Sequence, residues 1–276
     1  MSRFFKSIPF VLWYFVSTFV VVSIVIFIFS YVFMKGAPSV NLQFIFDSPK
    51  GMPLGMEGGI LPAILGSLAL MLLACISAAI LGISTAIYLC FYCSSNGIKN
   101  LIHLIVSSIA GVPSIVLGLF GYSFLVYFCG FGVSLISGGI TLGIMVFPYV
   151  EIMAEKAILE VDKNLIFSSY ALGIDKCYTF FYIVLPRCKD EILSGIIMSG
   201  GFAMGAAAPV MLTSAVVSAP NPDSLFSPVM ALPYHLYILV SQGISFEKAY
   251  GTALVLIVIL IILNTTAALI SVGRRQ

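Results

Sequence analysis

Residues 151–191 read EIMAEKAILEVDKNLIFSSYALGIDKCYTFFYIVLPRCKDE and concentrate charge in an otherwise very apolar chain. Within this segment, Gly173 is followed by Ile183, Leu185 and Pro186 in the pattern Gly…Ile-x-Leu-Pro. Long apolar runs lie on both sides of it, so the segment is predicted to connect two membrane-spanning helices. A membrane protein with one large polar excursion most readily uses it to contact a partner in water. The segment is therefore the first candidate for a functional site.

The composition is that of an integral membrane protein. Of the 276 residues, 61% are hydrophobic and only 9% are charged, and the mean hydropathy is +1.14. Soluble domains average about 25% charged and about 45–50% apolar residues. The net charge of +2 comes without a basic patch, which argues against a nucleic-acid partner.

The apolar runs predict an all-α membrane fold with six transmembrane helices. A helix needs about 20 apolar residues to cross a hydrocarbon core of about 30 Å. Six runs approach or exceed this length: 8–34, 60–92, 101–129, 132–150, 191–217 and 248–272. Pro113 lies inside the third run and is expected to kink or break its helix, because proline removes a backbone hydrogen bond.

Basic residues predict that both termini lie in the cytoplasm. Arg3 and Lys6 precede the first run, and Arg274 and Arg275 follow the last. With six spans and both ends inside, ten basic residues face the cytoplasm and three face outward, as the positive-inside rule requires. The first run is much longer than the apolar region of a signal peptide, which is about 7–15 residues, and is interpreted as an uncleaved anchor.

Few side chains suggest chemistry inside the membrane. The runs contain almost no ionisable groups, and the main exception is His103, near the cytoplasmic end of the third run. This scarcity of ionisable groups argues against a proton-coupled pump. Cys90 and Cys93 form a C-x-x-C pair that could indicate redox or metal chemistry. Because no second Cys pair or His-x-x-His accompanies them, they are interpreted as packing residues, and no metal or cofactor is predicted.

The charged segment carries a family resemblance. Residues 167–186 read FSSYALGIDKCYTFFYIVLP. The spacing from Ser168-Ser169 through Gly173 to Leu185-Pro186 resembles the "EAA" loop of ABC importer membrane subunits. In that family two short helices meet at the glycine, and the loop docks on the ATP-hydrolysing subunit. Glycine permits a left-handed turn between helices, and the proline is expected to start the return to the membrane.

Further motifs narrow the resemblance to the phosphate importer permease of PstA type. They are GGILPAILGSLAL (58–70), SIAGVPSIVLGLFGYSF (108–124) and AMGAAAP (203–209). The resemblance implies the type I importer permease fold, with an N-terminal anchor and periplasmic loop in 1–59. A transmembrane domain would follow in 60–272, with a coupling loop at 151–190. It also implies a multi-pass protein of the bacterial inner membrane.

The same resemblance implies partners and a division of labour. A PstA-type permease pairs with a sister permease of PstC type, two ATP-binding subunits of PstB type and a periplasmic phosphate-binding protein of PstS type. The chain itself would not be an enzyme and would hold no cofactor, because ATP is bound by the partner.

Two sets of candidate residues follow from the resemblance and the motifs. The predicted docking helix and its return to the membrane comprise Tyr170, Ala171, Leu172, Gly173, Ile174, Asp175, Lys176, Leu185 and Pro186. The predicted wall of the translocation path comprises Ser67, Ser107, Ser108, Pro113, Ser114, Gly205 and Pro209. The alternative for the Pro113 region is a structural kink in which serines bond to their own helix.

Two departures from the family pattern leave alternatives open. Phe167-Ser168-Ser169 stands where the family has Glu-Ala-Ala or Glu-Ala-Ser. Residues 202–209 read FAMGAAAP where the family has Arg-Ala-x-Gly-Glu-Thr-Ala-Pro, so an arginine and a glutamate are missing. The cargo could therefore be sulfate, molybdate or tungstate instead of phosphate. The chain could also be a transport-impaired subunit kept for assembly or signalling. A secondary transporter would need inverted repeats and ionisable residues at the midplane, and neither is found.

Overall fold

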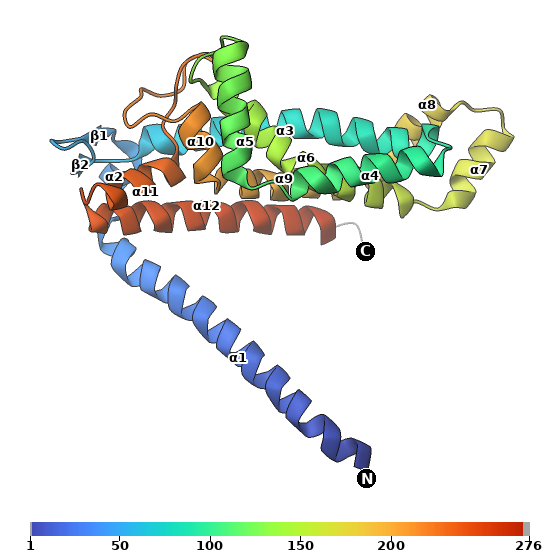
Figure 1. Ribbon diagram of the computed structural model, residues 1–276, viewed down its shortest axis with the longest axis horizontal. Coiled ribbons are helices and arrows are strands. Elements are labelled where there is room, and N and C mark those ends of the chain that lie inside the picture. Colours follow the sequence, from blue (N-terminus) through green and yellow to red (C-terminus); the bar gives the residue numbers. More distant parts are fainter. Residues whose placement is uncertain (1, 273–276) are drawn as a thin grey trace.

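The structure, a computed structural model, describes residues 2–272 as a long helical bundle (Figure 1). Its helices are α1 Ser2–Gly36, α2 Leu42–Phe46, α3 Leu61–Ile87, α4 Asn96–Ala110, α5 Ser114–Gly121, α6 Leu135–Leu159, α7 Lys163–Ala171, α8 Lys176–Tyr178, α9 Leu185–Met204, α10 Ala207–Thr213, α11 Leu232–Ser241 and α12 Phe246–Val272. A short 3-10 turn, η1 Ala37–Ser39, follows α1, and π-helical turns lie at η2 Tyr88–Tyr92, η3 Tyr122–Phe128 and η4 Thr179–Val184. Strands β1 Pro49–Lys50 and β2 Glu57–Gly58 pair antiparallel.

Four helices in the described residues are long and apolar enough to cross a membrane, and two bent pairs raise the number to six. In the first pair, Asn96–Ala110 and Ser114–Phe128 meet at 96°. In the second, Lys176–Met204 and Ala207–Thr213 meet at 71°. The six predicted spans are therefore present when each pair counts as one. The break expected at Pro113 is confirmed, because α4 ends at Ala110 and Pro113 has an extended ψ of 135°.

Two helix boundaries differ from the prediction. The fourth run was expected to end at residue 150, but α6 continues to Leu159, so its last turns belong to the bundle and not to the loop. The return to the membrane was expected to start at Pro186, but the continuous helix already begins at Lys176. The π-helical η4 ends at Val184, two residues before Pro186. A proline ring would otherwise clash with the carbonyl four residues earlier, and a wider turn relieves that clash.

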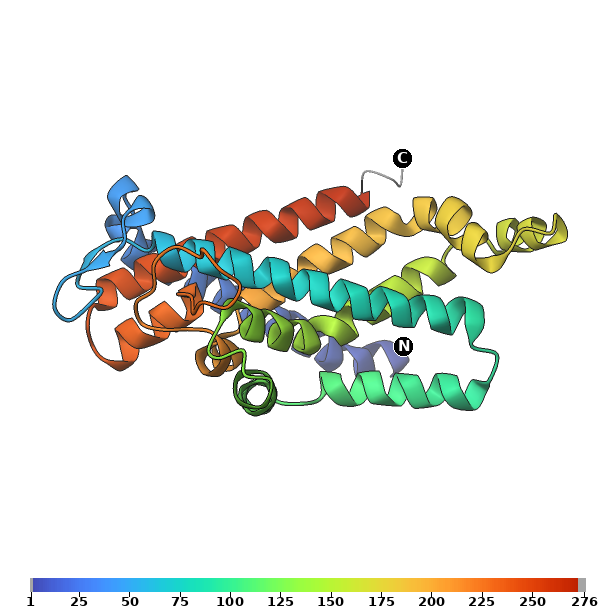
Figure 2. The same cartoon turned by 90° about the horizontal axis from the view of Figure 1, so that it is seen from above.

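The core of the bundle lies between α3 and α6, with α9 alongside. Figure 2 shows these helices running together along the long axis, with α12 packed against α9. Leu70, Ala74, Leu142 and Val146 form part of the buried cluster between them. Small residues let the helix backbones approach closely, as predicted for the second span. By contrast, α1 diverges from the bundle and joins it only near Gly36, where it meets α12 (Figure 1).

The two ends of the bundle differ in structure. The strand end carries β1, β2, α2 and α11, and the opposite end, here called the loop end, carries η2, α7 and α8 (Figure 1). Segments near both termini, the first turns of α1 and the last turns of α12, point toward the loop-end side in that view.

His235 on α11 makes the stability of the strand end depend on pH. Its side chain is 7% exposed, and burial, with a smaller effect of Lys248, lowers its pKa from 6.5 to about 4. Between these values the unfolded chain binds a proton that the folded chain does not, so stability falls as the pH falls. At pH 5 we expect a loss of about 2 kcal/mol relative to pH 7. Thermal unfolding in detergent at both pH values measures it, and His235→Gln should remove most of that difference. An unchanged pH dependence in His235→Gln would contradict the assignment.

Candidate functional site

The charged segment forms a projection with two helical arms at the loop end. Helices α7 and α8 meet at a turn in which Gly173 has a φ of +77°. Gly173 N donates to Tyr170 O at 3.0 Å, and Ile174 N donates to Ser169 O at 3.1 Å. These two bonds are the Schellman pattern that ends a helix on a left-handed residue. The predicted left-handed turn at Gly173 is therefore confirmed.

The residues predicted as a docking helix do not form one. Tyr170 and Ala171 end α7, residues 172–175 form the turn, and Lys176 begins α8. Leu172 is 80% exposed, so the most exposed large apolar residue of the projection lies on the turn. The helix that precedes the turn is α7 itself, which begins at Lys163.

Each arm begins at an aspartate that caps it. Asp162 accepts a hydrogen bond from Asn164 N at 2.9 Å, and Asp175 accepts from Cys177 N at 3.0 Å and Tyr178 N at 3.3 Å. The first N–H groups of a helix lack partners within the helix, and an aspartate at this position satisfies them. The sequence noted both aspartates near the loop, and their capping role explains why they stand there.

A buried hydrogen bond joins the two arms. The hydroxyls of Ser169 on α7 and Thr179 at the start of η4 lie 2.9 Å apart, and both residues are almost fully buried. Ser169 Oγ also lies 2.8 Å from Ile166 O, and Thr179 Oγ1 lies 2.8 Å from Asp175 O. Each hydroxyl has one proton, so one of them donates to the other, and the hydroxyl that accepts donates to its own backbone carbonyl. Ser169 stands where the resembled loop has its last small residue. The projection is thereby held as one unit behind the Gly173 turn.

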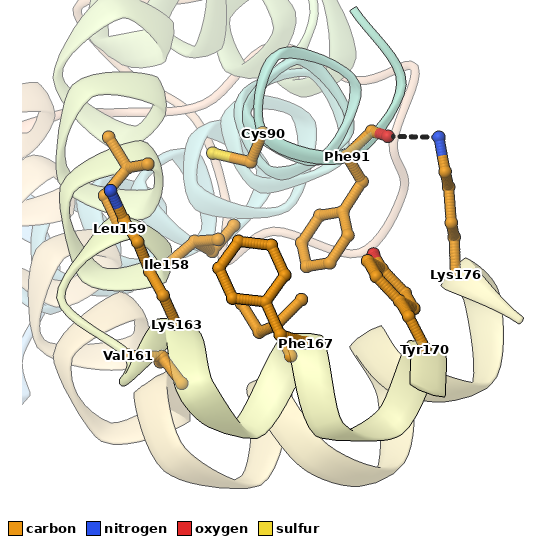
Figure 3. Close-up of a pocket in the computed structure, with 10 residues that line it drawn as sticks. Cys90, Phe91, Ile158, Leu159, Val161, Lys163, Phe167, Tyr170 and Lys176 are labelled. Carbon is orange, nitrogen blue, oxygen red and sulfur yellow. Dashed lines mark hydrogen bonds between the residues drawn. The ribbon is translucent and has the colours of Figure 1, made fainter. Parts of the chain in front are cut away.

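A mostly apolar cavity of about 280 Å³ lies where α7 faces the rest of the bundle (Figure 3). Its lining comprises Cys90, Phe91, Ile158, Leu159, Val161, Lys163, Ile166, Phe167, Tyr170 and Lys176. Lys176 Nζ donates to Phe91 O at 2.8 Å and lies 5.4 Å from the centroid of the Tyr92 ring. Burial raises the pKa of the Tyr170 phenol. The turn is therefore fastened to the end of η2, next to the cavity.

The remaining predicted loop residues belong to the body of the bundle. Leu185 packs against the apolar cluster that includes Phe180 and Val184, and Pro186 is exposed in the first turn of α9. Cys93 is buried, and Cys90 packs against the same cluster.

Some of the predicted path residues are brought together, because α5 packs on α10. A Cβ on Gly118 would lie 2.8 Å from Pro209 Cα, and one on Gly121 would lie 3.0 Å from Thr213 Cγ2. The two helices therefore run in the same direction, and the breaks that precede them lie at the same end of the pair. The residues of these breaks, Pro113, Ser114 and Gly205, are exposed, whereas Pro209 is buried.

The predicted serines play different parts. Ser107 and Ser108 are exposed on α4, and Ser108 Oγ donates to Leu104 O at 2.7 Å within its own helix, which is the back-bonding alternative. Ser67 is buried on α3, away from the breaks, and accepts a hydrogen bond from Leu232 N at 2.8 Å. The structure thus gives Ser67 a place under the start of α11 and not beside the breaks in α4–α5 and α9–α10.

Ser67→Ala tests this structural role. The substitution leaves the buried Leu232 N–H without an acceptor, so we expect a loss of about 1–3 kcal/mol of stability. Transport per folded molecule should stay unchanged. Ser84→Ala is the matched control, because Ser84 is exposed and donates to Ile80 O within its own helix at 2.6 Å. Thermal unfolding in detergent should separate the two variants, and equal midpoints would contradict the role.

Two functional candidates, Glu151 and Glu155, were missed by sequence reasoning. Both were assigned to the polar loop, but they lie on α6, where Glu151 is fully buried. They face His103 of α4, the main ionisable group expected inside the membrane. Their spacing of four residues, directly after an apolar run, was the available signal, because such a pair shares one face of a continuing helix.

The helical membrane fold and its charged cytoplasmic-type loop are features of a known family of transport proteins, and comparison with that family identifies the class of this chain. Residues 78–272 match the family described as "Binding-protein-dependent transport system inner membrane component". The chain belongs to this family and is a permease component of an ABC importer.

Individual members of this family and one solved structure are also similar to the chain. The chain is 32% identical to "Phosphate transport system permease protein PstA" of Mycobacterium leprae (strain TN), covering 79% of this chain and 72% of the relative. It is 25% identical to "Probable ABC transporter permease protein YqgI" of Bacillus subtilis (strain 168), covering 90% and 89%. Among solved structures, the methionine ABC transporter MetNI in inward-facing conformations matches with a TM-score of 0.65 at 15% identity, covering 76% of this chain and 93% of that one. This last match supports the type I permease fold alone.

Proposed function

We propose that the chain is the permease subunit of an ATP-driven phosphate importer. The observation that carries the proposal is the likeness to phosphate permeases of PstA type, at 32% identity over 79% of the chain. The subunit would form half of the translocation pathway with a sister permease. A periplasmic phosphate-binding protein would deliver the cargo. ATP would be bound and hydrolysed by two partner subunits, so that this chain performs no catalysis and needs no cofactor.

The loop-end projection is the proposed contact with the ATPase. The projection has an exposed tip at Leu172 and Gly173, two capped arms and a buried Ser169–Thr179 hydrogen bond. These features suit a rigid element that would transmit movement of the ATPase subunit to the membrane helices. The tie from Lys176 to Phe91 would carry that movement into α3 through η2. The excess of basic residues at this end supports a cytoplasmic placement, with both termini on the same side of the inner membrane.

The cargo has to be reconciled with the missing arginine and glutamate of residues 202–209. Helix N-termini attract anions, because their first N–H groups are free and the helix dipole is positive there. The N-terminus of α5 lies exposed at the Pro113 break, and Ser114 adds a hydroxyl. These donors, together with groups of the sister permease, would contact phosphate in place of a buried cation. The same missing pair favours a second candidate cargo, another oxyanion such as sulfate, molybdate or tungstate.

Reconstitution with the partner subunits tests the proposal. The complex in proteoliposomes, supplied with ATP and the binding protein, should take up labelled phosphate. A complex whose ATPase partner cannot hydrolyse ATP is the control. Uptake of sulfate, molybdate or tungstate without uptake of phosphate would show that the cargo is that other oxyanion. A complex that assembles but moves none of these anions would make the chain a transport-impaired subunit.

A further inference from the structure

Three ionisable side chains converge where α4 packs against α6. One ligand atom each from His103, Glu151 and Glu155 lies within 4.8 Å of the others, and His103 Nε2 lies 3.6 Å from Glu155 Oε1. Glu151 and Glu155 stand on successive turns of α6, so they project from the same face of that helix. This is the one such group in the part of the chain whose side chains the structure describes.

Glu151 supplies a second and independent observation. Its side chain is fully buried, and both of its carboxyl oxygens lack a hydrogen-bond partner among the described residues. Buried polar atoms are nearly always paired, because an unpaired group loses its hydration without compensation. The base of the cluster is also closed by α3, since a Cβ on Gly82 would lie 2.9 Å from Glu151 N. An orphaned carboxylate aimed at a histidine and a second carboxylate calls for a ligand between them.

We propose that His103, Glu151 and Glu155 bind a divalent transition-metal cation, with Zn²⁺ as the probe ion. The ion pair between Glu155 and His103 is the only one that the described residues show for either carboxylate. In their ionised forms the two carboxylates would carry charge that a divalent cation balances. Mixed imidazole and carboxylate ligands suit Zn²⁺ better than Mg²⁺ or Ca²⁺, which prefer oxygen alone.

Access and geometry fit such an ion. The side chains of His103 and Glu155 are 44% and 19% exposed, so they form the mouth, while Glu151 forms the sealed base. Ligand atoms about 2.0–2.2 Å from Zn²⁺ lie about 3.3 Å from one another, so small side-chain rotations would close the cluster. Because His103 and the glutamates come from different helices, the bound cation would fasten α4, half of the first bent pair, to α6.

Zinc binding to the full-length chain, purified with its partner subunits, tests the proposal. The exposed Cys129 and Cys177 are first replaced by serine to remove competing thiols. We expect one Zn²⁺ per chain after desalting, measured by elemental analysis, and a higher thermal midpoint with Zn²⁺. Glu151→Gln and His103→Gln should each weaken binding by at least about tenfold, because each removes a ligand. Glu160→Gln is the matched control, since Glu160 lies just past α6 and pairs with Lys156 at 3.8 Å.

A rescue variant keeps the test independent of folding defects. His103→Cys should retain metal binding, because a thiolate is also a good Zn²⁺ ligand, and with Co²⁺ it should add a sulfur-to-metal absorption band that the parent lacks. The proposal fails if the parent protein retains no Zn²⁺, or if Glu151→Gln binds as tightly as the parent. It also fails if Co²⁺ bound to His103→Cys shows no sulfur band. None of these outcomes depends on which anion the complex transports.

Discussion

Gly173→Pro is expected to reduce ATP-dependent uptake severely while leaving the chain folded in the membrane. Proline fixes φ near −65°, whereas Gly173 has a φ of +77°. It also removes the N–H that donates to Tyr170 O at 3.0 Å. The turn must therefore be rebuilt, and Leu172 would no longer be presented at the tip. A docking surface weakened by even 1.4 kcal/mol loses about tenfold in affinity, so uptake should fall by at least about tenfold.

The chain contains a matched control for this substitution. Gly243, in the turn between α11 and α12 at the strand end, has a φ of +63°. Gly243 N donates to Val240 O at 3.1 Å and Ile244 N to Leu239 O at 3.0 Å, the same pattern as at Gly173. Gly243→Pro therefore imposes the same backbone change far from the proposed docking surface. Phosphate uptake and ATP hydrolysis by both reconstituted complexes measure the difference. Normal uptake by Gly173→Pro, or equal loss in both variants, would contradict the docking assignment.

The features predicted correctly from sequence depend on local rules. The left-handed turn at Gly173 and the break at Pro113 follow from backbone preferences that a residue carries with it. The six spans follow from the length of apolar runs, although two of them are bent. Within the described residues, the bend at residues 205–206 was not predicted, because glycine density near Gly200 and Gly201 indicated close packing and not the position of a break.

The features that sequence reasoning missed depend on tertiary contacts. Charged residues were interpreted as exposed to water, so Glu151 was placed in the loop. In the structure Glu151 lies on α6 and is buried where α3 and α4 pack against that helix. The predicted docking helix ran across Gly173, because the family motif indicates which residues form the loop but does not indicate where α7 ends and α8 begins. The Ser169–Thr179 bond joins residues ten positions apart across a turn, and neither residue signals the pairing on its own. Likewise the burial of Ser67 depends on the start of α11, which packs over it and is distant in sequence.

Gly66→Ala is expected to reverse the usual effect of replacing glycine in a helix. Alanine normally stabilises a helix interior by about 1 kcal/mol relative to glycine. Gly66, however, lies in α3 directly under the segment that leads into α11. A Cβ there would clash with the Met230 carbonyl oxygen and lie 3.1 Å from its carbonyl carbon and 3.3 Å from Val229 Cβ. These are backbone atoms or atoms next to the backbone, so no side-chain rotation relieves the contact.

The clash would lift a segment that the core depends on. Val229, Met230 and Leu232 are almost completely buried, and they join the two apolar clusters on either side of α3. Forcing extra atoms into such packing costs about 1–3 kcal/mol, and the immobile backbone places Gly66→Ala at the upper end, about 3 kcal/mol. Gly97→Ala on α4 is the control, because only Ser95 Oγ would lie near its Cβ, at 3.7 Å. Thermal unfolding in detergent should show Gly66→Ala below the parent and Gly97→Ala at or above it. A midpoint for Gly66→Ala at or above that of the parent would mean that the segment is not seated on α3 as described, since a seated segment leaves no room for a methyl group.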